Sequence, residues 1–388
     1  MIRSTSFGIV VFINCLFIYK YSSRVTDHAW LLTAVIAIIS YVLFAKWEII
    51  ASGSTLKKLA NILVLSVPLV VAIVAFIIID PQTLKIERWS VIHNFLDTWF
   101  SGKYPYFAVS HMGNPPGPMP VYYIIALPFY FFKGYSFLGA LGYLLVGYLT
   151  LKEKLNRSQF VILYSILSVF LVYEIMGLSN LFTYTALCAL SLLSFEKAIE
   201  KRGSAILFSC LLLGLMLSTR SVYALVYVVF FVSYLKTKRL TFKKCTIYTV
   251  LIMSVFAITF LPFILFYGDS FTKMNPFIVQ SSFLVPQIYV ACFFIIAIMG
   301  GLLASNTAQR FFYSGVTLFI AICIYAVYQI FTNGLHAAFI GSKIDITYFI
   351  FTVPFLLVAQ VFIKNTASEP QLFYIITKIS REFAFAKA

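Results

Sequence analysis

The side chains that could do chemistry are few in this 388-residue chain, since only 11% of it is Asp, Glu, Lys or Arg. One segment between two apolar runs carries Asp80, Glu87 and Arg88, followed by His93 and Lys103. A carboxylate can take a proton from a hydroxyl group, and an arginine or a lysine can bind an anion. This segment is therefore the first place to expect a reaction.

The same segment has the residue types, but not the spacing, of a metal site. His93 and His111 together with Glu87 and Asp97 could hold an ion on paper. The spacing of Glu87 and His93 matches no known ligand signature, and the six cysteines form no Cys-x-x-Cys pair. We therefore predict no metal site and no cofactor, and leave a divalent-metal requirement open.

The elements that position these residues must lie in a membrane. Hydrophobic residues make up 61% of the chain, more apolar surface than a water-soluble fold of this size could hide. This excludes a soluble enzyme, a nucleic-acid-binding protein and a secreted disulfide scaffold. The sequence predicts an all-α polytopic membrane protein whose partners include membrane lipids but no nucleic acid.

The apolar runs predict the domain organisation, because a span needs about 20 apolar residues. We expect 1–79 to be a three-helix N-terminal extension, 80–133 a large outer loop with interfacial helices, 134–364 the remaining transmembrane helices, and 365–388 a tail. About 12 transmembrane helices are predicted, and the runs are 5–20, 30–46, 58–79, 135–151, 159–174, 181–195, 205–218, 221–235, 246–267, 285–304, 311–331 and 345–363.

The basic residues predict the orientation. They gather in alternate loops, which places those loops, both termini and most of the net charge of +16 on the cytoplasmic side. The apolar stretch Val121–Phe132 must then stop at half depth, because a full crossing would move the later basic loops outside. The tail region Phe373–Lys387 is expected as a basic amphipathic helix on the inner leaflet. We expect a multi-pass protein of a bacterial-type inner membrane.

Arg220 is a candidate functional residue on the predicted outer side. It lies between two apolar runs, in Leu217-Ser-Thr-Arg-Ser221. An arginine at the edge of the bilayer is costly unless it is paired, so a functional role is the default expectation. Glu174 and Asp345 border other outer turns, and either could pair with Arg220 or hold a substrate hydroxyl.

The outer loop is expected to contain a surface helix followed by a stiff connector. From Glu87 to Phe100, apolar residues recur at helical spacing, which predicts an amphipathic helix ended by Gly102. Four prolines between Pro115 and Pro120 then predict an extended segment with few hydrogen-bond donors. Such a segment can rest against lipid and shape a cavity.

This loop has an early acidic residue, an aromatic surface helix, a Gly-x-Tyr-Pro-Tyr element at 102–106 and a proline-rich entry into a short apolar segment. In these features it resembles the corresponding loop of the GT-C glycosyltransferases. These multi-span enzymes use polyprenyl-phosphate-linked sugars. The resemblance, clearest over residues 80–150, implies a glycosyltransferase, mannosyltransferase-like, that acts on a glycan or lipid acceptor at the outer face. Whether it inverts or retains configuration stays open.

The resemblance also implies roles for individual residues. An acid in this loop serves as catalytic base, for which Glu87 is the first match and Asp80 the second. The departing lipid phosphate needs cations or donors aimed at it. The residues expected to bind donor phosphate are Arg220, Arg88 and Lys103. Those expected to line the substrate cavity are Tyr104, Tyr106, Asn114 and His93.

Two other readings remain. An O-antigen polymerase or ligase also has about a dozen spans, but its main loop usually comes late in the chain. A transporter or flippase usually has ionisable residues or matched breaks near the midplane. Pro68, Pro262 and Pro354 lie in or near spans, but no ionisable residue lies at the centre of a predicted span and no repeated halves are evident.

Overall fold

The computed structural model describes residues 1–363 apart from 51–53, 153–157, 202, 283–285 and 342–343. Within these ranges every regular element is a helix. The predicted tail, 365–388, and its amphipathic helix lie outside the described residues. The all-α prediction is therefore confirmed for the part of the chain that the structure describes.

Each predicted apolar run corresponds to helix in the structure. The helices are α1 (Ile2–Ser22), α2 (Ala29–Ile50), α3 (Ser54–Ile78), α6 (Tyr135–Lys152), α7 (Ser158–Ile166), α8 (Val169–Met176), α9 (Leu181–Lys201), α10 (Ser204–Leu217), α11 (Tyr223–Lys236), α12 (Phe242–Ile258), α15 (Gln287–Leu303), α16 (Thr307–Asn333), and the 3₁₀-helix η4 (Ile346–Thr352) continued by α17 (Val353–Val361). The run at 159–174 is divided between α7 and α8, because Ser168 caps a new helix through its side chain. The run at 246–267 is divided between α12 and α13 (Leu261–Lys273), which are bent by 57° from each other.

Several of these helices are long and apolar enough to cross a bilayer. By length and composition four qualify among the described residues, or up to seven if each of three bent pairs counts as one span. Their outward faces are apolar: on α2, Trp30, Ile38 and Tyr41 are each more than 60% exposed. Exposed surface of this kind suits lipid rather than water. The count of about 12 spans stays a prediction.

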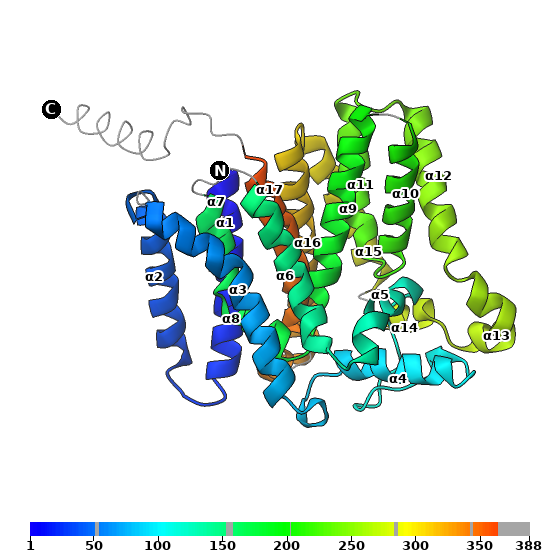
Figure 1. Ribbon diagram of the computed structural model, residues 1–388, viewed down its shortest axis with the longest axis horizontal. Helices are drawn as coiled ribbons and strands as arrows, with labels where there is room; N and C mark the ends of the chain where they lie inside the picture. The colour runs from blue at the N-terminus through cyan, green and yellow to red at the C-terminus, as the bar shows by residue number, and fades with distance from the viewer. Residues whose placement is uncertain (51–53, 153–157, 202, 283–285, 342–343, 364–388) are drawn as a thin grey trace.

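The short elements gather at one end of the helical bundle (Figure 1). They are α4 (Arg88–Phe100), α5 (Pro120–Phe131), α13 (Leu261–Lys273) and α14 (Pro276–Ser282), with the 3₁₀-helices η1 (Pro81–Thr83) and η2 (Pro105–Phe107) and the π-helix η3 (His336–Ile340) in the connections. In Figure 1, α4 lies across the ends of the long helices. The short helix α5 is bent by 116° from α6, as a broken span or a re-entrant segment would be.

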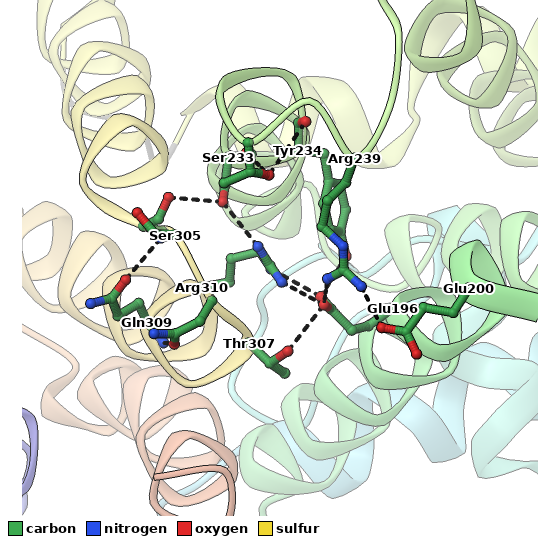
Figure 2. Close-up of polar contacts among 12 residues, drawn as sticks. Glu196, Glu200, Ser233, Tyr234, Arg239, Ser305, Thr307, Gln309 and Arg310 are labelled. Atoms are coloured by element: carbon green, nitrogen blue, oxygen red, sulfur yellow. Dashed lines mark hydrogen bonds and ion pairs between the residues drawn. The ribbon is translucent and has the colours of Figure 1, made fainter. Parts of the chain in front are cut away.

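An ion-pair cluster joins α9, α11 and α16. Glu196, 5% exposed at its side chain, accepts hydrogen bonds from Arg310 Nε at 2.9 Å, from Tyr234 Oη at 2.7 Å and from Thr307. Arg239 pairs with the same carboxylate, as Figure 2 shows. Because buried charges are costly unless paired and hydrogen-bonded, loss of one member of this cluster would leave an uncompensated charge between the three helices.

Candidate functional site

The helix α4 carries the first group of candidate residues at its N-terminus. Its apolar face is buried, with Ile92, Phe95 and Leu96 fully inside. Phe95 stacks on Tyr123 of α5 with ring centroids 3.5 Å apart. The helix ends before Gly102, whose φ of 75° is in the left-handed region that glycine adopts without strain. The predicted amphipathic helix and its glycine stop are therefore confirmed, while its place on a membrane surface stays a prediction.

Glu87 is half-buried just before α4 and is held by the loop that follows. Its Oε2 accepts hydrogen bonds from Ser110 Oγ and from Asn114 Nδ2, both at 2.7 Å. No described residue donates a hydrogen bond to its Oε1. One oxygen thus fixes the carboxylate while the other is open to a further partner. Asn114 was expected to line a cavity, and here it orients Glu87.

Arg88 is held by several protein partners. Its Nη1 donates to Ser179 Oγ at 2.7 Å, and its Nη2 donates to Asp345 Oδ2 at 2.6 Å and to Thr347 Oγ1. Three of the five N–H donors of a guanidinium are thereby occupied. Burial alone lowers the pKa of Arg88, but the carboxylates of Asp345 and Glu174 more than offset this and raise that pKa above its ordinary value. Arg88 is a fixed cation.

Arg220 is held differently. It lies in the turn between α10 and α11, with its guanidinium carbon 5.2 Å from the centre of the Tyr122 ring. Its Nε is buried without a hydrogen-bond partner, and no carboxylate in the described residues forms an ion pair with it. The Tyr122 hydroxyl donates to Asn180 Oδ1 at 2.7 Å, which leaves the Asn180 Nδ2 buried and unpaired. Unpaired donors therefore gather around Tyr122.

These groups belong to one site at the α4 end of the bundle. The hydroxyl of Tyr348, in η4, interacts electrostatically with the charges of Asp345, Arg220, Arg88 and Glu87. Arg88 and Arg220 also act jointly on Tyr122. The charges of Glu87 and Arg220 thus both act on one hydroxyl, that of Tyr348. A carboxylate with an open oxygen can take up a proton, and a guanidinium can bind an anion. We call these groups the Glu87–Arg220 site.

Two of the predicted residues lie apart from these contacts. Asp80 is exposed, and its Oδ1 accepts the backbone amide of Gln82 at 3.0 Å, which caps η1. This local capping explains its position without a role in catalysis. Lys103 is also exposed, in the turn after α4.

The two predicted cavity tyrosines are packing residues in this structure. Tyr104 and Tyr106 are buried among the aromatic rings beside α4 and α5. Tyr104 Oη donates to the carbonyl of Met274 at 2.6 Å, and Tyr106 Oη donates to the carbonyl of Pro118 at 3.3 Å. Burial raises the pKa of Tyr104 above its ordinary value, so its hydroxyl stays protonated as a donor. Together they fix the loop that holds Glu87.

His93 faces a different set of partners. Its Nδ1 lies 2.9 Å from Tyr135 Oη, and its Nε2 lies 3.3 Å from Asp97 Oδ2. The other oxygen of Asp97, Oδ1, accepts a hydrogen bond from the hydroxyl of Tyr130. Within the described ranges no group of three or more His, Cys, Asp or Glu could hold a metal ion.

Sequence reasoning missed the uncharged members of the site. Ser110, Ser179, Thr347 and Tyr348 each contact or neighbour a predicted charge, yet nothing in their local sequence marks them. Tyr122 was visible only as part of an apolar stretch.

No protein-family model, curated protein or solved structure matches this chain.

Proposed function

We propose that this protein is an integral-membrane glycosyltransferase of the GT-C type, which moves a sugar from a polyprenyl-phosphate donor to a glycan or lipid acceptor on the extracytoplasmic face. The observation that carries the proposal is the Glu87–Arg220 site: a carboxylate held by one oxygen and an arginine with no anionic partner in the described residues, whose charges both act on Tyr348. Glu87 directly precedes α4, which lies across the ends of the long helices (Figure 1), and Arg220 lies in the turn between α10 and α11.

The residue types match the two ends of the reaction. The acceptor hydroxyl gives its proton to Glu87 Oε1 as its oxygen forms a bond to the anomeric carbon of the sugar. The bond between that carbon and the phosphate oxygen breaks, and its electron pair leaves with the lipid phosphate. Arg220 stabilises the departing phosphate, since a guanidinium presents paired donors to such an anion.

The surroundings of the site suit a lipid donor. The short helix α5 joins the site through Tyr122, and Ile124 and Phe131 on it are at least half exposed. A polyprenyl chain can lie against such an apolar surface while its phosphate reaches Arg220. In this proposal about 12 spans cross a bacterial-type inner membrane with both termini in the cytoplasm.

Reconstitution tests the proposal. The purified full chain in lipid nanodiscs is incubated with polyprenyl-phosphate-mannose and other polyprenyl-phosphate hexoses, each with a lipid or oligosaccharide acceptor. Release of free polyprenyl phosphate, matched by sugar on the acceptor, supports a transferase. A protein that moves the intact donor across vesicles without cleaving it is a flippase, and that result rejects the proposal.

A further inference from the structure

A chain of contacts connects the first helix of the protein to Glu87. Lys20, in the last turn of α1, donates from Nζ to the carbonyl of Ile344 at 3.1 Å. The next residue, Asp345, forms the ion pair with Arg88, which directly follows Glu87. Segments that are 324 and 257 residues apart in the sequence are thereby joined.

Lys20 is an unusual residue to find buried. It is only 3% exposed, near the end of an apolar helix. A lysine at the end of a membrane helix ordinarily extends to the interface, because burying its ammonium is costly. Here Nζ instead contacts the Ile344 carbonyl and lies 5.6 Å from the centre of the Phe339 ring. Its position thus fixes the backbone beside Asp345.

Asp345 in turn uses both oxygens within the protein. Its Oδ1 accepts from the amide of Thr347 and so caps the start of η4, and its Oδ2 accepts from Arg88. The carboxylate is therefore bound on one side to a helix start and on the other to α4. A carboxylate with this many donors is a support, whereas Glu87 keeps one oxygen open.

Arg88 is correspondingly unsuited to be the main phosphate ligand. Three of its donors are occupied, and its charge is balanced by the nearby carboxylates of Asp345 and Glu174. Its contacts fix the N-terminus of α4, where no side chain supplies a capping hydrogen bond. The two arginines therefore have different roles: Arg88 fixes α4, and Arg220 is available to bind an anion.

We propose that Lys20 and Asp345 are positioning residues that act through Arg88 to hold Glu87 in place. This inference rests on the proposed function for its catalytic part, since Glu87 is the base only if the chain is a transferase. Its structural part, the anchoring of α4, stands without it. Misplacing a reacting group by about 1 Å can cost on the order of 100-fold in rate.

The test measures anchoring and catalysis separately. Hydrogen exchange of the full chain in nanodiscs is followed over peptides covering 87–100, in the wild type, Asp345→Asn and Lys20→Met. The matched control is Asp269→Asn, which changes an exposed carboxylate on α13. Transfer from polyprenyl-phosphate-mannose, or whichever hexose is active, is measured in the same preparations. If Asp345→Asn fails to fold, Ser179→Ala removes another hydrogen-bond partner of Arg88 and is the milder change.

We expect exchange in α4 to rise about tenfold or more in Asp345→Asn and Lys20→Met, and to be unchanged in Asp269→Asn. We also expect kcat to fall at least tenfold while KM for the donor changes less than twofold. A merely structural role would lower the amount of folded protein without this split.

Two results would overturn the inference. Unchanged exchange in α4 would show that the contacts do not anchor it, whatever the enzyme does. A raised KM for the donor at constant kcat would show that Arg88 binds the donor phosphate itself. If the wild type transfers no sugar, the proposed function fails, and the exchange data alone then decide whether α4 is anchored in this way.

Discussion

Replacing Glu196 by glutamine should destabilise the protein far more than the same change at Glu200. The Glu196 side chain is 5% exposed and accepts hydrogen bonds from Arg310, Arg239, Tyr234 and Thr307. Arg310 is itself only 1% exposed. A glutamine has the volume but not the charge, so it leaves a buried guanidinium without its counter-ion.

The expected magnitude follows from burial. Breaking a buried ion pair by removing one partner costs about 3–5 kcal/mol. Glu200 pairs with the same Arg239, but its side chain is 67% exposed, and an exposed pair contributes roughly 0–1 kcal/mol. The two substitutions thus differ in burial while sharing chemistry and a partner, which makes Glu200→Gln the matched control.

The assay is unfolding in mixed micelles of dodecyl maltoside and SDS, with the free energy of unfolding measured for the wild type and both variants. A second experiment removes both charges, by Glu196→Met with Arg310→Met, which should cost less than the sum of the single changes. A loss for Glu196→Gln within about 1 kcal/mol of that for Glu200→Gln would refute the reasoning.

Two further substitutions test the Glu87–Arg220 site. Arg220→Gln should weaken binding of polyprenyl phosphate at least tenfold, because it removes a guanidinium that has no ion-pair partner among the described residues. Lys103→Gln, which changes an exposed loop lysine, should change this binding less than twofold; equal effects would argue against Arg220 as the phosphate ligand. Asn114→Ala removes one of the two hydrogen bonds to Glu87 Oε2. In steady-state kinetics it should lower kcat about tenfold while the affinity for the donor is unchanged. An unchanged kcat would mean that this hydrogen bond does not orient the base.

Local features could be predicted from the sequence because they depend on neighbouring residues. The surface helix expected from Glu87 to Phe100 is observed as Arg88–Phe100, and Gly102 stops it as expected. The apolar runs also form helices, because a backbone surrounded by hydrocarbon must satisfy its hydrogen bonds within the segment. Helix length and composition do not show that about 12 of these helices are membrane spans, so that number stays a prediction.

The partners of the charged residues could not be predicted in the same way. Arg88 pairs with Asp345, 257 residues later, and Glu196 with Arg310, 114 residues later. A single sequence contains no signal for such pairs, because any exposed or buried acid would satisfy the same local pattern. For this reason Asp345 was considered as a partner for Arg220, and its actual partner is Arg88.

The place of the first helix was also beyond sequence reasoning. Residues 1–79 were expected to form an extension, because three apolar runs precede the outer loop whereas the commonest layout of the resembled family has one. In the structure α1 packs against α2, α7, α8, α16, α17 and η4, and so lies within the bundle. Its buried Lys20 donates a hydrogen bond to the carbonyl of Ile344.

Transfer by the Glu87→Gln variant is the most direct test of the central claim. Glutamine can keep the hydrogen bond from Ser110 but cannot take a proton from the acceptor hydroxyl. In nanodiscs with a polyprenyl-phosphate sugar and acceptor, we expect kcat to fall by a factor of 100 or more, on the order of a lost general base, while polyprenyl phosphate still binds. Asp80→Asn should retain full activity. Full activity of Glu87→Gln would contradict the account.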